Sequence, residues 1–104
     1  MKCIINIAEE TIGEVDFELT DVSMGTIGGL FIPNENYFKY QALVQSHCNN
    51  KGISNIHDFD YRITLYDNID LNLEGGIGIT DIQGFNEIYI EGAGLNQDQL
   101  SNFR

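Results

Sequence analysis

Residues 13–21 read Gly13-Glu14-Val15-Asp16-Phe17-Glu18-Leu19-Thr20-Asp21. Apolar and acidic side chains alternate along this stretch, which is the pattern of a β-strand with one buried and one exposed face. The period of two places the carboxylates of Glu14, Asp16 and Glu18 together on the exposed face. Such a row of like charges repels itself unless water, salt or a cationic partner neutralises it.

Further strands are predicted on both sides of this segment. Residues 2–8 are expected to form a hairpin with 13–21, and residues 27–32 a strand whose glycines permit a bulge or a close backbone approach. The alternation returns further along the chain. It predicts a strand at 59–66, a turn at 67–68 and a second strand at 69–74. A turn at Gly75-Gly76 is expected to lead into 77–79, and a last strand is predicted at 86–91.

One main helix is predicted over about residues 34–50. Asn34 is suitable as its N-cap, and Gly52 can take the positive φ of a C-terminal stop. A short helix or an ordered tail is expected at 96–103. The order of strands, helix and strands predicts one α+β domain over residues 1–104, with a largely antiparallel sheet and the helix packed on one face. The stripe expected to pack is Tyr37, Tyr40, Gln41, Val44, His47 and Cys48, widened by Phe38 and Leu43.

Charge is the unusual quantity of this composition. Sixteen acidic residues stand against five basic ones, and the formal net charge is −11. This balance disfavours nucleic acid and anionic membranes, whose phosphates require Lys and Arg. It favours a basic partner, cations or simple solubility. Two cysteines are too few for a disulfide framework and are expected to be buried and reduced. No leader or membrane-spanning segment is recognised in the sequence, so a cytoplasmic location is expected.

The candidate partner-binding residues are outward acids and two outward tyrosines. Tyrosine is enriched at binding hot spots, and carboxylates set orientation and association rate. A second layer of structure, or the end of the chain, is an alternative cover for the tyrosines. No catalytic residue, metal ligand or cofactor is assigned. The candidates are Glu14, Asp16, Glu18, Asp60, Tyr66, Asp70, Glu87, Tyr89 and Glu91.

Two segments offer an alternative function as a small metal-binding domain or an enzyme. Asp70-x-Asn72-x-Glu74-Gly75-x-x-x-x-x-Asp81 fits the spacing of a calcium loop. Two observations oppose a calcium loop: the two-residue period of a strand continues through the motif, and a β-hairpin accounts for the same residues. The acids of residues 57–60, with His57, His47 and Cys48, offer a second set, whose spacing fits no zinc pattern.

Two further segments carry a resemblance. Met24-Gly25, Gly28-Gly29-x-Phe31-x-Pro33-Asn34-x-x-Tyr37 and Gln41 resemble a segment of small bacterial proteins that include the immunity proteins of toxin–immunity systems. Glu87-Ile88-x-Ile90-Glu91-Gly92-x-Gly94-Leu95 is similar to their C-terminal part. The resemblance implies a non-enzymatic inhibitor that occludes the cationic site of a basic toxin, such as a nuclease. An oligomeric adaptor that associates through a sheet edge remains a third hypothesis.

Overall fold

A computed structural model describes residues 1–66 and 69–100. The strands form an antiparallel sheet in the order β5-β7-β8-β4-β2-β1-β6, and β3 also pairs with β4. The fold class is therefore α+β, as predicted. The elements are β1 (Lys2–Ile7), β2 (Glu10–Asp16), β3 (Glu18–Asp21), β4 (Thr26–Pro33), the 3-10 helix η1 (Glu35–Lys39), α1 (Gln41–Lys51), β5 (Ser54–Asn55), β6 (Tyr61–Leu65), β7 (Leu73–Thr80), β8 (Tyr89–Leu95) and α2 (Gln97–Leu100).

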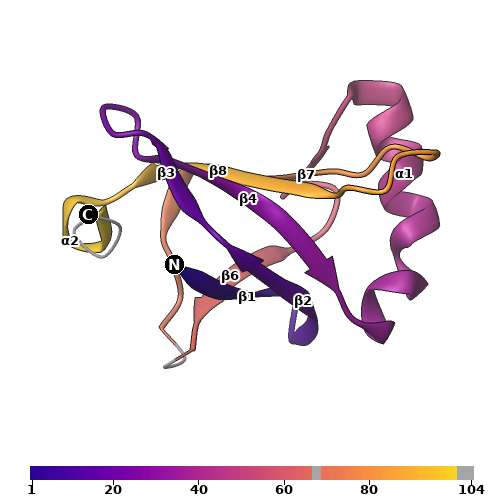
Figure 1. Ribbon diagram of the computed structural model, residues 1–104, viewed down its shortest axis with the longest axis horizontal. Coiled ribbons are helices and arrows are strands. Elements are labelled where there is room, and N and C mark those ends of the chain that lie inside the picture. Colours follow the sequence, from indigo (N-terminus) through magenta and orange to yellow (C-terminus); the bar gives the residue numbers. More distant parts are fainter. Residues whose placement is uncertain (67–68, 101–104) are drawn as a thin grey trace.

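The sheet curls so that its two halves enclose the core. Figure 1 shows β7 and β8 above β1 and β6, with β4 crossing between them and α1 standing at one end. The inward side chains of both halves meet in a single apolar cluster. Its fully buried members include Ile5, Ile12, Val15, Ile63, Ile79 and Ile90.

The alternating stretch of residues 13–21 is extended, as predicted, but it forms two strands. β2 ends at Asp16 and β3 begins at Glu18. Between them, the Phe17 amide donates to the Met1 carbonyl at 2.7 Å and so leaves the ladder to β4. The two-residue period continues through this break, because Phe17 remains buried while Asp16 and Glu18 are exposed.

The helical segment begins and ends at the predicted signals, but the α-helix itself begins only at Gln41. The Asn34 side chain accepts a hydrogen bond from the Asn36 amide, and Gly52 closes α1 with φ 83°. The first turns are a separate 3-10 helix that ends at Tyr40. The buried stripe is narrower than predicted, because α1 stands at the end of the curled sheet. Phe38 and Leu43 are 58% and 57% exposed.

The predicted turn at Gly75-Gly76 is wrong. Both glycines lie inside β7, where a bulge between Leu73 and Gly76 shifts its register with β8. The chain turns instead through residues 81–88, between β7 and β8. Residues 69–72 form no strand and contribute only a bridge between Asp70 and Thr64. The predicted turn at 67–68 and the last residues of the predicted C-terminal helix, 101–103, lie outside the described residues.

Gly94 is the glycine whose replacement we expect to cost most in this hairpin. Its φ is 83°, and a Cβ there would lie 2.6 Å from the Gly75 amide nitrogen. Gly94→Ala combines a left-handed backbone with a clash against backbone, so we expect a loss of about 2 kcal/mol or more in the free energy of unfolding. Urea denaturation measures it.

Gly84→Ala is the matched control for this prediction. Gly84 has φ 94°, and nothing lies within 4 Å of its added Cβ. The difference between the two variants therefore isolates the close approach of the strands from the cost of positive φ. Equal losses would show that the packing of Gly94 against β7 contributes nothing.

Candidate binding face

Three cross-strand rows make up the outer face, which we define as the side of the sheet directed away from the core. The first row is Thr64, Ile4, Glu14 and Ile32. The second contains the paired residues Lys2 and Asp16, followed by Leu30, Tyr89 and Thr80. The third is Glu18, Gly28, Glu91, Gly78 and Asn55. Strand pairing thus brings together five predicted binding residues: Glu14, Asp16, Glu18, Tyr89 and Glu91.

Tyr66 lies against this face as well. Its hydroxyl donates to a carboxylate oxygen of Glu14 at 2.5 Å, and this hydrogen bond raises the pKa of Tyr66. Glu87 lies beside the face, in the turn between β7 and β8, where it borders a cleft with Tyr89.

The other two predicted residues lie at the β6 edge and already have partners. Asp60 forms an ion pair with Arg62 at 3.0 Å. Asp70 accepts a hydrogen bond from the Thr64 hydroxyl at 3.2 Å. Asp70 is bridged to Thr64 and so extends the first row at the β6 edge, whereas the charge of Asp60 is compensated by Arg62.

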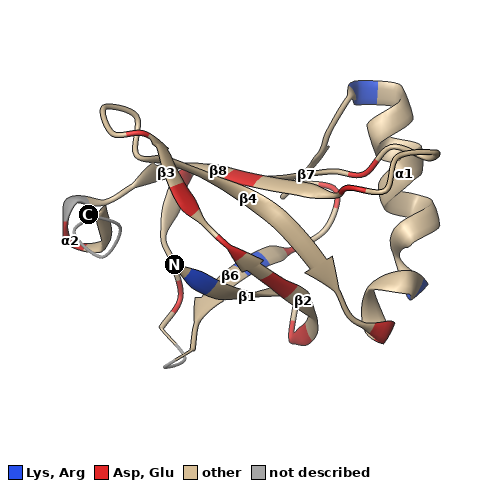
Figure 2. Ribbon diagram, viewed as in Figure 1, with Lys and Arg blue, Asp and Glu red and all other residues tan. Residues whose placement is uncertain are grey.

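Few basic residues lie on the outer face: Lys2 stands in its second row, and Arg62 is exposed on β6. The sequences of β2, β3, β4, β7 and β8 contain no Lys or Arg. Figure 2 shows carboxylates along β2 and β3, with Lys and Arg at the helices, β1 and β6. Three described bases are already engaged: Lys39 with Glu10 at 2.7 Å, Lys51 with Asp58 at 2.5 Å, and Arg62 with Asp60.

Two carboxylates of the outer face have neither an ion pair nor a side-chain hydrogen bond among the described residues. Asp16 pairs with the amine of Met1 at 2.9 Å, which lowers the pKa of Asp16, and Glu14 accepts from Tyr66. Among the residues that the structure describes, Glu18 and Glu91 form no ion pair. They flank Gly28 in the third row. The carboxylates with no partner of either kind therefore lie at one place on the sheet, and the neutral Tyr66 hydroxyl leaves the charge of Glu14 uncompensated as well.

An apolar ridge lies next to these carboxylates. Leu30, Ile32 and Tyr89 are 52%, 60% and 37% exposed. Leu30 and Tyr89 separate two clefts of about 490 and 480 Å³. The first is bordered by Glu14, Asp16 and Glu18, and the second by Ile82, Phe85 and Glu87.

Sequence reasoning did not assign Leu30 and Ile32 to a site. The apolar run of residues 27–32 left open whether it forms core or interface. The signal lay in its period, because Ile27 and Phe31 point inward and Leu30 and Ile32 outward. Phe85, which is 71% exposed, falls in a turn where no periodicity marks it.

Tyr89 is held against the sheet by Gly28. A Cβ on Gly28 would lie 2.1 Å from the Tyr89 hydroxyl oxygen and 2.8 Å from Cζ, so the phenol lies over the bare backbone. This is the close approach predicted for the glycines of this strand. Among the described residues the Tyr89 hydroxyl has no hydrogen-bond partner, and no other ring stacks on it. Tyr89 borders both clefts.

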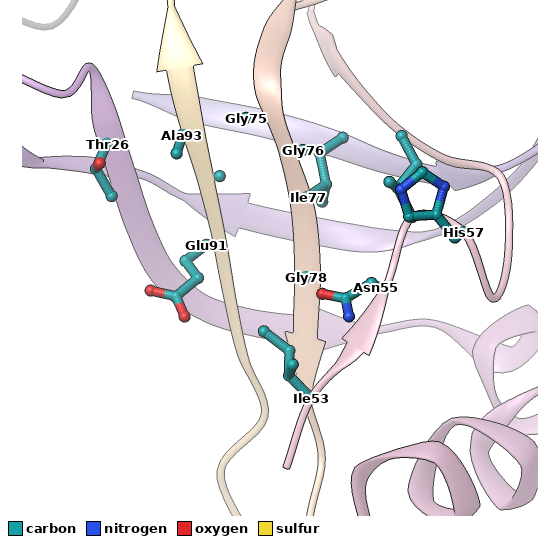
Figure 3. A pocket seen from close by; sticks show the side chains of 12 residues that line it. Thr26, Ile53, Asn55, His57, Gly75, Gly76, Ile77, Gly78, Glu91 and Ala93 are labelled. Carbon is teal, nitrogen blue, oxygen red and sulfur yellow. The ribbon is translucent and has the colours of Figure 1, made fainter. Parts of the chain in front are cut away.

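A smaller cleft of about 270 Å³ lies at the β5 end of the outer face. In Figure 3, Thr26, Ala93 and Glu91 lie on one side of β7, with Asn55 and His57 on the other. Gly76 and Gly78 leave the middle of this cleft without side chains. Its single carboxylate, Glu91, is shared with the third row.

Residues 70–81 do not have the geometry of a calcium loop. Asp70 and Asp81 stand at opposite ends of β7, whose eight extended residues span roughly 25 Å. Asp81 is buried, and its carboxylate accepts hydrogen bonds from Tyr37 at 2.6 Å, Gln45 at 3.1 Å and Gln41 at 3.3 Å. Burial of the Tyr37 hydroxyl and its hydrogen bond to Asp81 raise the pKa of Tyr37. Asp81 therefore joins β7 to the helical segment.

The second alternative set, around residues 57–60, is dispersed. His57 borders the small cleft. The Asp58 carboxylate accepts hydrogen bonds from Lys51 and from the backbone amide of Asn55, and the contact with Lys51 lowers the pKa of Asp58. The Nδ1 atom of His47 lies 3.6 Å from Asp58. Cys48 is buried, with its thiol 3.3 Å from the Ile79 carbonyl. Over residues 1–66 and 69–100, no three His, Cys, Asp or Glu residues are grouped as metal ligands would be.

Both cysteines are buried and unpaired, as predicted. Burial raises the pKa of the Cys3 thiol to about 11. None of the helices in the described part of the chain has the length and apolar character needed to cross a membrane. No protein-family model, curated protein or solved structure matches this chain.

Proposed function

We propose that this chain is a binding protein that neutralises a basic protein partner through its outer face. One observation carries the proposal: the strands that build this face contain many acids and only two bases, Lys2 of β1 and Arg62 of β6, and Arg62 is already paired with Asp60. Exposed sheet faces that need only solubility are served equally well by mixed charges. A one-sided charge next to exposed apolar side chains favours a cationic partner.

The proposed mechanism has two stages. The field of the carboxylates first steers the partner and raises the association rate above the value for uncharged proteins. The ridge of Leu30, Ile32 and Tyr89 then packs against the partner, and the resulting exclusion of water strengthens the ion pairs. A partner whose substrate groove is cationic would be occluded by this contact.

The resemblance to immunity proteins makes the partner a bacterial toxin domain. The test is co-expression of the chain with the protein encoded by the adjacent open reading frame, with cell survival and association kinetics as the readouts. We expect protection, and an association rate that falls tenfold or more between roughly 50 and 500 mM salt. Loss of viability despite full expression of both proteins would overturn the toxin assignment, and a salt-independent rate would overturn the mechanism.

A further inference from the structure

We infer that Tyr89 is the docking platform for an arginine side chain of the basic partner, with Glu18 and Glu91 as its carboxylate acceptors. This inference rests on the proposed function and specifies the chemistry that the outer face recognises. It commits the face to one occupant, an arginine presented by a protein, in preference to a lysine or a neutral aromatic side chain.

The first argument is the position of the Tyr89 ring. The phenol lies over Gly28, where a Cβ would collide with its hydroxyl oxygen, Cζ and Cε1. The sheet thus supports the ring from below, while Tyr89 remains 37% exposed. A tyrosine held in this way offers its free face to a planar cation at little cost in side-chain entropy.

The second argument is the arrangement of free charge around the ring. Glu18 and Glu91 are the direct cross-strand neighbours of Gly28, one on each side. Two strand spacings therefore separate them, roughly 10 Å between their Cα atoms. The Tyr89 phenol lies between them, so a cation stacked on it is within reach of either carboxylate. Neither carboxylate has an ion-pair partner among the described residues.

The third argument is the apolar surface beside the ring. Leu30 is the direct cross-strand neighbour of Tyr89, and the two residues border the same cleft of about 490 Å³. Arginine has a methylene stem that packs on apolar surface and a planar guanidinium that stacks on aromatic rings and binds carboxylates with two hydrogen bonds. A lysine ammonium is a point charge that remains strongly hydrated, so the ring and the ridge favour arginine.

The experiment is a titration of the ¹⁵N-labelled protein with three synthetic peptides, penta-arginine, penta-lysine and penta-citrulline, followed by NMR chemical shifts. We expect penta-arginine to bind roughly three- to tenfold more tightly than penta-lysine, with the largest shifts at Gly28, Tyr89 and Glu91. Penta-citrulline, which has the same shape without charge, is expected not to bind.

Substitutions separate the ring from the charge. Tyr89→Phe retains the preference for arginine, whereas Tyr89→Leu removes it by weakening penta-arginine more than penta-lysine. Gly28→Ala, which displaces the ring without altering any charge, acts like Tyr89→Leu. Glu18→Gln with Glu91→Gln weakens both cationic peptides, and the control pair Glu9→Gln with Glu35→Gln, which are exposed acids outside the three rows, has a smaller effect.

The outcomes distinguish this inference from the proposed function. Equal binding of penta-arginine and penta-lysine at the outer face would overturn the arginine assignment and leave the basic-partner proposal standing. Shifts confined to other parts of the molecule, or binding unaffected by Glu18→Gln with Glu91→Gln, would overturn both.

Discussion

Asp81→Ala is expected to lower the free energy of unfolding by about 3 kcal/mol, because it leaves buried donors without an acceptor. The Tyr37 hydroxyl and the side-chain amides of Gln41 and Gln45 all donate to this carboxylate. Domains of this size have a total stability of about 5–15 kcal/mol, so the loss is large. Urea denaturation should show a midpoint lowered by roughly 1–3 M.

Tyr37→Phe tests the same network if the alanine variant does not fold. It removes one donor and retains the ring that packs on Phe31 at a centroid distance of 5.1 Å. Tyr61→Phe is the matched control, since Tyr61 is also buried but, among the described residues, its hydroxyl binds Ser54 alone, at 2.7 Å. We expect the free energy of unfolding to fall by about 2 kcal/mol in Tyr37→Phe and by about 1 kcal/mol in Tyr61→Phe. Equal losses would show that the carboxylate adds nothing to an ordinary buried hydrogen bond.

Local pattern was sufficient to predict most of the strands and the two ends of the helical segment. Alternation placed Val15 and Phe17 inside, and Asn34 and Gly52 marked the helical segment. The prediction from local pattern failed at Gly75-Gly76, because two glycines are equally compatible with a turn and with a bulge in a strand that packs closely against its neighbouring strand. What decides between them is the approach of Gly94, a contact between strands that sequence spacing does not contain.

The role of Asp81 was missed for a related reason. Its spacing from Asp70 matched a metal motif, whereas its partners Tyr37, Gln41 and Gln45 belong to another segment of the chain. A signal was present, since glutamine on an apolar helical stripe requires a buried polar partner. The sequence does not show which carboxylate supplies that partner.

The acidic outer face was predictable in kind and not in arrangement. Each acidic strand position could be identified as outward, but the order of strands determines which of them share a face. That order brings Glu18 of β3 and Glu91 of β8 to either side of Gly28, although more than seventy residues separate them. It also separates Asp60, paired with Arg62, from the free carboxylates.

Glu18→Lys with Glu91→Lys is expected to abolish the proposed protection against the product of the adjacent open reading frame. The reversal places two ammonium groups beside Tyr89, where the proposal puts the partner's cations. Repulsion at a desolvated contact, added to the loss of both ion pairs, should weaken binding roughly 100-fold or more, which is about 3 kcal/mol. Cell survival in the co-expression assay and the dissociation rate of the purified complex measure the effect.

Glu9→Lys with Glu35→Lys is the control that gives this reversal its meaning. It changes the net charge by the same amount at exposed acids outside the three rows of the outer face. Long-range steering depends on total charge, so this pair should slow association several-fold and leave dissociation and protection intact. If both double variants lost protection equally, the partner would be recognised by overall charge alone, and the outer face would have no special role. If neither did, the acidic rows would serve only solubility.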